Sequence, residues 1–281
     1  MDPLIFAAVL FAALLHAIWN ALIKVSADRL ILMAVTTAAS ALLTLPFLFV
    51  LPLPASASWP YLAATVVVHC VYNLMLIRAY GHGDFAQVYP LARGSAPLLT
   101  ALFGFVLLGE AMQLSELLGM GLIVAGIFAL VGERAQGIPQ LTGPALGYSL
   151  LTGLCITAYS LVDGAGARLS GNSFSYVAWM FFLDGFPIPL IAVLRRTPQL
   201  LSLTVRRVWQ PGLLVALLST IAYAIVVWGF SQERIAPIAT LRETSVLFAL
   251  LISVFVIRER FSWLRSVIVG LIAGGIVLLG I

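Results

Sequence analysis

The sequence predicts an all-α integral membrane protein with ten transmembrane helices, arranged as two inverted repeats of five helices. Three observations predict this fold: the composition, the spacing of the apolar runs, and a repeat within the chain. Of the 281 residues, 62% are hydrophobic and 9% are charged, whereas about a quarter of the residues are charged in a soluble domain. A buried core does not account for so few charges, because a soluble protein must also cover its surface.

Each expected helix is an apolar run of roughly 20 residues, the length that crosses a bilayer. The segments between the runs are too short to form a domain outside the membrane. Alternation of polar and apolar residues at period two is absent, which argues against a transmembrane β-barrel. We expect helices near residues 4–24, 30–50, 60–80, 88–108, 115–132, 145–164, 174–194, 211–231, 237–257 and 263–280.

The chain repeats itself when it is shifted by about half its length. Two shifts, of 149 and 141 residues, bring like residues together at a constant spacing: Arg93 with Arg242, Glu110 with Glu259, and Pro46 with Pro187. The two shifts differ by eight residues, so we expect a longer loop in the second copy, at 195–210. We place the first repeat at 1–135 and the second at 142–281. Since five is an odd number, the second copy must cross the membrane in the opposite sense.

The basic residues give an independent test of this topology. In a membrane protein, Lys and Arg gather in the loops that face the cytoplasm, so the net charge of +4 is not read as a nucleic-acid footprint. One side of the expected bundle has only Arg168 and Arg234. The other side carries Lys24, Arg29, Arg78, Arg134, Arg195, Arg196, Arg206, Arg207, Arg258, Arg260 and Arg265. We therefore expect both termini outside, in the periplasm of a bacterium whose inner membrane holds the protein.

Inverted repeats are typical of secondary transporters, which bind their substrate near the middle of the membrane between the two halves. The Gly-Glu pair at 109–110, the Arg-Glu pair at 258–259, and the glycine-spaced helix after each pair resemble the drug/metabolite transporter (DMT) superfamily, specifically its EamA-type ten-helix members. The resemblance implies exchange or export of small metabolites by alternating access, without a cofactor. The chain is most similar to the YddG-type exporters of aromatic amino acids. A drug cation, a nucleotide sugar or another metabolite is the alternative solute.

Glycine-spaced stretches allow close approach of helices where apolar burial provides no drive for association. Six small residues mark such faces in the two expected helices that end the repeats: Gly121, Ala125, Gly126, Gly270, Gly274 and Gly275. Because the two repeats of one chain can pair with each other here, we expect a monomer.

Polar and aromatic residues recur every three or four positions on several expected helices, which places them on one face away from lipid. Amides, imidazoles and aromatic rings in one cavity suit a zwitterion with an aromatic or apolar side chain. The alternative is that these groups only bond neighbouring helices. The substrate-binding candidates are His16, Trp19, Asn20, His69, Tyr72, Asn73, Tyr80, Tyr159, Tyr223 and Trp228.

Arg93 and Arg242 occupy equivalent positions of the two copies, each near the start of an expected helix. We expect them on opposite sides of the membrane, as parts of an inner and an outer gate, with Glu243 able to pair with Arg242. Snorkelling of either arginine to the lipid headgroups is the alternative. Prolines that disturb these helix starts complete the set of gating candidates: Pro90, Pro97 and Pro237.

Asp184 lies near the middle of an expected helix, in the segment "FFLDGFPIP". The glycine and prolines that follow predict a kink there. A lone carboxylate at this depth is costly, so Asp184 is either a proton site that couples transport or one member of a structural pair with an Arg or His. Its counterpart in the first repeat, Leu43, is apolar.

The sequence argues against three other classes of protein. An intramembrane enzyme needs a nucleophile with a base, or a cluster of metal ligands, and neither spacing occurs in the sequence. Cys70 and Cys155 fall inside apolar runs and are interpreted as packing residues. A channel would require a continuous polar pore, and a scaffold would show no solute flux. The sequence therefore favours a transporter that needs only a small-molecule substrate and the lipid bilayer as partners.

Overall fold

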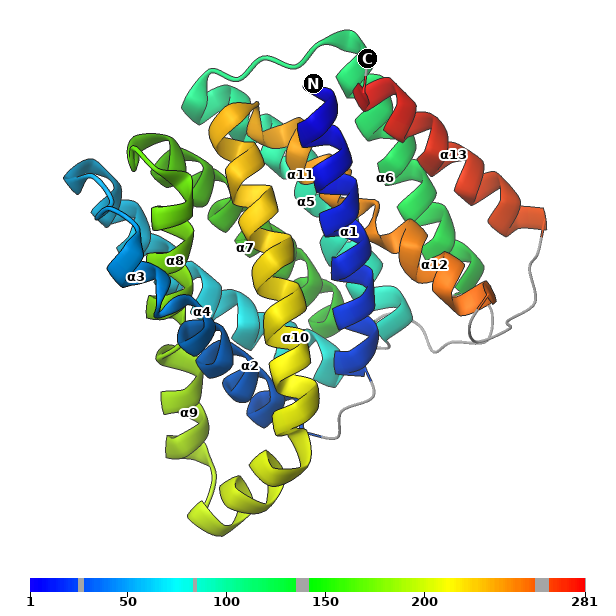
Figure 1. Ribbon diagram of the computed structural model, residues 1–281. Helices are drawn as coiled ribbons and strands as arrows, with labels where there is room; N and C mark the ends of the chain where they lie inside the picture. The colour runs from blue at the N-terminus through cyan, green and yellow to red at the C-terminus, as the bar shows by residue number, and fades with distance from the viewer. Residues whose placement is uncertain (25–27, 83–84, 135–141, 256–262, 281) are drawn as a thin grey trace.

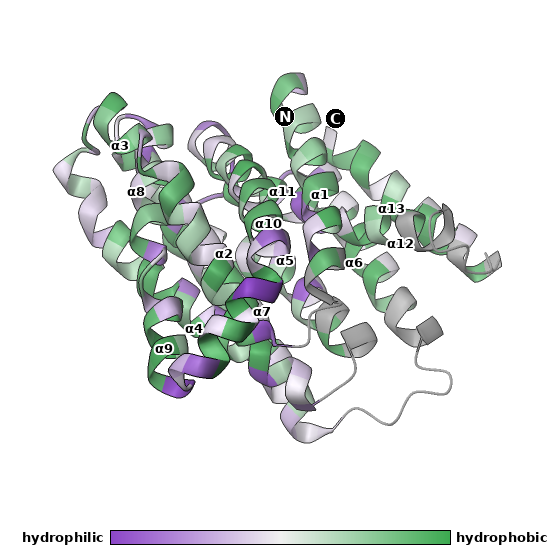
Figure 2. Ribbon diagram, turned by 60° about the horizontal axis from the view of Figure 1, so that its bottom comes forward, coloured by the Kyte–Doolittle hydropathy of each residue, from purple (hydrophilic) through white to green (hydrophobic). Residues whose placement is uncertain are grey.

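The structure, a computed structural model, describes residues 1–24, 28–82, 85–134, 142–255 and 263–280. Helices account for nearly all of this chain, and both termini lie at one end of the bundle (Figure 1). We call this the terminal end and the other the opposite end. Hydrophobic residues occur along nearly every helix (Figure 2). Many large apolar side chains, such as Phe49 and Leu194, face outward.

The first half contains α1, α2, α3, the short 3-10 helix η1, α4, α5 and α6. Their bounds are Pro3–Lys24, Arg29–Thr44, Phe47–Val50, Ser56–Ser58, Trp59–His82, Phe85–Leu108 and Leu114–Arg134. The second half contains α7 to α13. Their bounds are Gly143–Leu169, Ser173–Asp184, Pro187–Arg195, Pro198–Gln232, Ile235–Glu243, Ser245–Phe255 and Trp263–Gly280.

These elements form the ten expected segments, because three of the segments are each divided into two helices: α2 and α3, α8 and α9, and α11 and α12. Seven segments are long and apolar enough to cross a membrane, and α6 and α13 carry shorter apolar stretches, Leu114–Ala129 and Ser266–Gly280. The first helix of each half, α1 and α7, begins at opposite ends of the bundle (Figure 1). The prediction of an all-α membrane protein with two inverted halves is confirmed.

Proline breaks the same segment in both halves. The first break separates α2 from α3 at Pro46, and the second separates α8 from α9 just before Pro187. Proline cannot donate to the carbonyl four residues back, so it weakens a helix, and at these two positions the helix is interrupted. The expected kink after Asp184 is therefore present, and its counterpart in the first half lies at the equivalent position.

Two expected boundaries were wrong. The stretch 195–210 is not a long loop, because α10 begins at Pro198 and continues to Gln232. Thr197 caps this helix by accepting a hydrogen bond from Leu200 N at 3.4 Å, and Pro198 suits a first helical turn. The expected helix 237–257 is also not continuous, because Thr244 interrupts it. The Thr244 hydroxyl donates to Leu241 O at 2.7 Å and competes with the helical backbone bonds there.

Helices of the two halves pack against each other throughout the bundle. α1 packs on α10, α4 and α5 pack on α7, and α6 packs on α13. The two halves are thus interleaved, and the surface between them passes through the centre of the molecule. Any site on that surface is built by both halves.

Glycines bring α6 and α13 together, but not all of the glycines expected to do so. A Cβ atom added to Gly275 would lie 2.6 Å from Gly119 O, and one added to Gly126 would lie 2.6 Å from Ile272 Cγ1. Gly121 and Gly270, in contrast, have open space where a Cβ atom would stand. The expected close approach therefore occurs on the faces that carry Gly119, Gly126 and Gly275. Gly121 and Gly270 face away from this contact.

We expect Gly275→Leu to destabilise the protein, because the side chain would meet the backbone of α6. Overpacking of this kind typically costs about 1–3 kcal/mol, which should lower the midpoint of thermal unfolding in detergent by several degrees. Gly270→Leu, on the open face of the same helix, is the matched control and should leave the midpoint nearly unchanged. Equal shifts for both variants would contradict the packing described here.

Candidate functional site

A cavity of about 150 Å³ lies between the two halves. The first half contributes α1, α2 and α4 to its wall, and the second half contributes α7, α8, α10 and α11. The lining residues on α1 and α2 lie mainly in the parts of these helices nearer the opposite end. The complete lining is His16, Trp19, Met33, Thr36, Thr37, Ser40, His69, Tyr72, Asn73, Tyr159, Phe181, Asp184, Val215, Ser219, Tyr223 and Arg242.

Seven of the ten substrate-binding candidates line this cavity: His16, Trp19, His69, Tyr72, Asn73, Tyr159 and Tyr223. Three candidates lie elsewhere. Asn20 donates to His16 O at 2.7 Å within α1. The Tyr80 ring lies 5.4 Å from the guanidinium carbon of Arg29, and Trp228 lines a separate depression at the terminal end.

The wall formed by α2 was not predicted from the sequence. Met33, Thr36, Thr37 and Ser40 recur at helical spacing and all line the cavity. This stripe is visible in "MAVTTAAS", but threonine and serine are common in membrane helices and gave a weaker signal than histidine or asparagine. Phe181 and Val215 were missed as well, because an apolar residue in an apolar helix has no distinguishing pattern.

An anionic cluster surrounds His69 on one side of the cavity. Nδ1 of His69 lies 2.5 Å from Asp184 Oδ2, and Nε2 lies 3.6 Å from Asp163 Oδ2. Asp163 is fully buried and accepts hydrogen bonds from the hydroxyls of Tyr223, at 2.6 Å, and Tyr176, at 3.1 Å. Asp184 therefore has the histidine partner that a structural pair requires. Its second oxygen, Oδ1, has no hydrogen-bond partner among the described residues.

A cationic cluster lies on the other side, where two arginines share one carboxylate. Glu243 Oε2 lies 3.0 Å from Nε of Arg93, and Glu243 Oε1 accepts a hydrogen bond from Nη2 of Arg242 at 3.2 Å. Arg93 also contacts Nε2 of His16. The three charged residues are each no more than 2% exposed. Two guanidiniums and one carboxylate leave one net positive charge on this cluster.

The expected placement of Arg93 and Arg242 on opposite sides of the membrane is wrong. α5 begins at Phe85 and α11 at Ile235, so each arginine lies about 10–12 Å along its helix at 1.5 Å per residue. The two helices start from opposite ends, and the arginines therefore meet near the middle. Both arginines are buried and paired with Glu243, which argues against snorkelling. Pro97 and Pro237 are buried in α5 and α11, and the side chain of Pro90 lies outside the described residues.

Tyr159 stands between the two clusters. Its ring centroid lies 5.5 Å from the guanidinium carbon of Arg242 and 4.7 Å from the ring centroid of His69. The Tyr72 and Tyr223 rings pack edge-on against it, at 5.5 and 5.7 Å. The cavity thus has a positive side, a negative side and an aromatic wall that joins them.

The terminal end of the bundle is closed by ion pairs that join the halves. Glu110 Oε1 lies 2.6 Å from Nη1 of Arg168, and Glu116 Oε1 lies 2.5 Å from Nη2 of Arg234. Glu110 Oε2 also accepts a hydrogen bond from the backbone of Ile235 at 2.8 Å. These contacts, which we call the terminal latch, fix the turn after α5 onto the α10–α11 junction. At the opposite end, one such pair, Asp28 with Arg196 at 3.3 Å, occurs in the described part of the chain.

Comparison with solved structures agrees with this fold. One structure, described only as a crystal structure of a protein, superimposes with a TM-score of 0.75 at 18% sequence identity. The match covers 98% of this chain and 94% of the other. A comparison with curated proteins found no match.

The sequence profile of the EamA-like transporter family matches twice, over residues 2–132 and again over residues 143–281. The two matches fall on the two halves of the bundle and together cover nearly the whole chain. With its two halves and its cavity between them, the chain belongs to the EamA-like transporter family.

Proposed function

We propose that this transporter moves a zwitterionic α-amino acid, with an aromatic or apolar side chain, through the cavity between its halves. The family consists of membrane transporters. Membership of this family therefore argues against the two alternatives, an intramembrane enzyme and a scaffold. The observation that carries the proposal is that Arg242 and Asp184 line the same cavity, on the two sides of Tyr159. An α-amino acid has its two opposite charges close together and fits between such groups.

The positive side suits the substrate carboxylate. Arg242 pairs with Glu243, and this one carboxylate contacts both Arg93 and Arg242 in the described part of the chain. Trp19 adds a donor, because its Nε1 has no hydrogen-bond partner within the described chain. A guanidinium and an indole N–H in the same cavity favour a carboxylate, since hydrogen bonds to charged groups are the stronger ones.

The negative side suits the substrate ammonium. The unpartnered oxygen of Asp184 offers an acceptor there, and a buried polar atom without a partner is costly until a ligand supplies one. The rings of Tyr72, Tyr159, Tyr223 and Phe181 form an aromatic wall, which supports an aromatic or apolar side chain over a sugar. One net positive charge is too little for a nucleotide sugar, whose diphosphate would require several.

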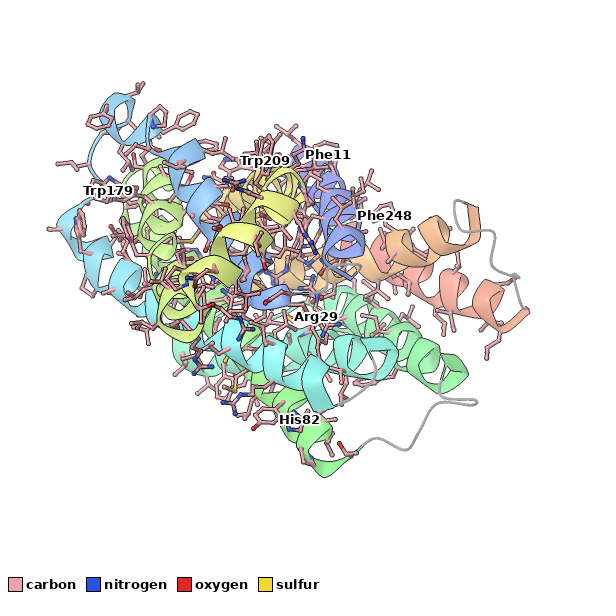
Figure 3. The ribbon with its side chains drawn as sticks, turned by 90° about the horizontal axis from the view of Figure 1, so that it is seen from below. Phe11, Arg29, His82, Trp179, Trp209 and Phe248 are labelled. Carbon is pink, nitrogen blue, oxygen red and sulfur yellow. The ribbon has the colours of Figure 1, made fainter. Side chains whose placement is uncertain are left out.

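We infer that the described conformation is open toward the cytoplasm and that the protein exports its substrate. Arg29, Arg78, Arg195, Arg206 and Arg207 lie at the opposite end (Arg29 is labelled in Figure 3). The positive-inside rule makes this end cytoplasmic and both termini periplasmic, as in the inner membrane of a bacterium. The terminal latch closes the periplasmic side, so the cavity is placed to load from the cytoplasm.

Because Arg93 and Arg242 meet in the middle of the bundle, they do not form an inner and an outer gate. The Arg93–Glu243–Arg242 cluster lies in the middle and joins α5 to α11, so we propose that it is a pivot between the halves. We propose that the terminal latch is the gate instead, and that it opens as the opposite end closes. Pro97 and Pro237 would shape the two helices that carry the pivot, and we assign Pro90 no contact.

Arg242→Met should weaken binding of L-phenylalanine by about tenfold to a hundredfold, because a charged hydrogen bond contributes roughly 1.5–3 kcal/mol. Phenethylamine, which lacks the carboxylate, should bind equally well to both proteins. Glu243 keeps Arg93 as its partner in this variant, so the fold should be retained. Arg206→Met, an exposed arginine of α10, is the control. The measurement is counterflow in proteoliposomes. If Arg242→Met weakened L-phenylalanine and phenethylamine equally, Arg242 would not be a carboxylate site. Flux of a nucleotide sugar or a drug cation, without flux of an amino acid, would contradict the substrate class.

Glu110→Arg should open the terminal end, because it places two arginines together in the latch. The readout is labelling of Ser219→Cys, in a background without Cys70 and Cys155, by an impermeant thiol reagent added from the terminal side. We expect labelling up to about fivefold faster, because a partly exposed ion pair contributes up to roughly 1 kcal/mol. Adding Arg168→Glu should partly reverse the change.

The control for the latch is Asp28→Arg, which breaks the ion pair at the opposite end. It should not increase labelling from the terminal side. If Asp28→Arg and Glu110→Arg gave the same result, the latch would have no specific part in closing the periplasmic side.

A further inference from the structure

The two carboxylates beside His69 favour a protonated imidazole over a neutral one. A neutral ring carries one N–H, and its other nitrogen is an acceptor. Nδ1 faces Asp184 Oδ2 at 2.5 Å and Nε2 faces Asp163 Oδ2 at 3.6 Å, so both ring nitrogens face carboxylate oxygens. In the neutral ring, one nitrogen lone pair would point at an anion. In the protonated ring, each nitrogen has an N–H to offer.

Asp163 does not supply the missing proton. Both of its oxygens already accept hydrogen bonds, Oδ1 from Tyr176 and Oδ2 from Tyr223. Hydrogen bonds donated to a carboxylate favour its ionised form. The geometry therefore places the additional proton at the short contact between His69 and Asp184, and not on Asp163.

We propose that His69, held between Asp184 and Asp163, is a binding site for one proton, and that this proton is exchanged for the ammonium group of the substrate. The proposal rests on the amino-acid transport proposed above and deepens it. When the substrate ammonium approaches Asp184 Oδ1, it adds a positive charge next to the imidazolium. His69 then releases its proton to the cytoplasm and stays neutral while the substrate is bound. After the periplasmic side opens, the ammonium leaves and a periplasmic proton returns to His69.

The charges of the cluster support one-for-one exchange. Asp163 and Asp184 together carry two negative charges when His69 is neutral. Either the proton on His69 or the substrate ammonium reduces this to one. Both together would cancel it, but they would share the single Asp184 carboxylate and stand side by side as two cations, which repel in an interior of low dielectric constant. Each occupant therefore disfavours the other.

The surrounding groups do not offer a competing proton site of the same kind. The charged or titratable residues that face the pair are Cys70 on α4, Tyr159 and Asp163 on α7, Tyr176 on α8, Tyr223 on α10, and Arg242 on α11 beyond the Tyr159 ring. The α2 wall contributes Met33, Thr36, Thr37 and Ser40, none of which titrates near neutral pH.

The depth of the pair suits exchange between the two sides. His69 lies ten residues after the start of α4 and Asp184 eleven after the start of α8. At 1.5 Å per residue, both lie about 15 Å from the terminal end, half of the roughly 30 Å hydrocarbon thickness. His69 comes from the first half and both aspartates from the second, so motion of one half against the other changes access to the proton.

The first test follows the charge of His69 directly, by NMR of protein with ¹³C-labelled histidine. His16→Gln and His82→Gln assign the three histidine signals. We expect a charged His69 ring at pH 7 in the free protein, and a neutral ring when L-phenylalanine is bound. A neutral ring in the free protein, or a ring whose charge is unaffected by bound L-phenylalanine, would overturn the proposal. If no amino acid binds, the proposed function fails and the exchange with it, whereas the charge of free His69 still reports on the proton site.

The second test measures coupling in proteoliposomes with the membrane potential clamped at zero. One proton per substrate means that a gradient of one pH unit should sustain about a tenfold gradient of L-phenylalanine, since each tenfold step corresponds to 1.4 kcal/mol on either side of the exchange. Asp184→Asn should abolish this accumulation at any pH gradient. Asp28→Asn, the same change at a carboxylate outside the site, should retain it. Wild-type transport without accumulation would show amino-acid transport to be correct and proton exchange to be wrong.

Discussion

A charge in the interior of a membrane bundle must be neutralised by other groups of the same chain, because the lipid offers none. Here the neutralising partner usually comes from the other half. Arg93 pairs with Glu243, His69 with Asp163 and Asp184, and Asp28 with Arg196. The two pairs of the terminal latch also join the halves. Among the described ion pairs, the Arg242–Glu243 contact alone stays within one half. The electrostatics therefore require that the halves be assembled together.

The two copies differ where this requirement is met. Glu243 corresponds to Gly94 in the first half, and a Cβ atom added to Gly94 would lie 3.2 Å from Ile127 Cγ2 on α6. Packing around Gly94 is thus tight, the first copy has no carboxylate at this position, and the single Glu243 contacts both arginines. Asp184 likewise corresponds to the apolar Leu43. The repeat supplies a symmetric frame, and substitutions at these positions give the cavity a positive side and a negative side.

The sequence predicted the features that depend on local pattern. Apolar length located the ten segments, proline located the break after Asp184, and spacing of three or four residues located seven cavity residues. Tyr80 and Trp228 show the limit of spacing, because periodicity gives the face of a helix but not the height of the cavity along it. The meeting of Arg93 with Arg242 was missed for a related reason. Their depth depends on where α5 and α11 begin, and an error of a few residues moves a side chain from the membrane surface toward its centre.

Exposure separates the ion pairs that can open from those that cannot. The arginine side chains of the terminal latch are 32% and 33% exposed, and Arg196 at the opposite end is 34% exposed. Water can solvate these groups when their pairs separate, so the free energy of breaking them is small. The side chains of Arg93 and Arg242 are each 3% exposed, and separating either from Glu243 would leave buried charges without partners. The ends of the bundle can therefore exchange partners with water while the central cluster stays intact. That difference is what a fixed pivot between two alternately opening sides requires.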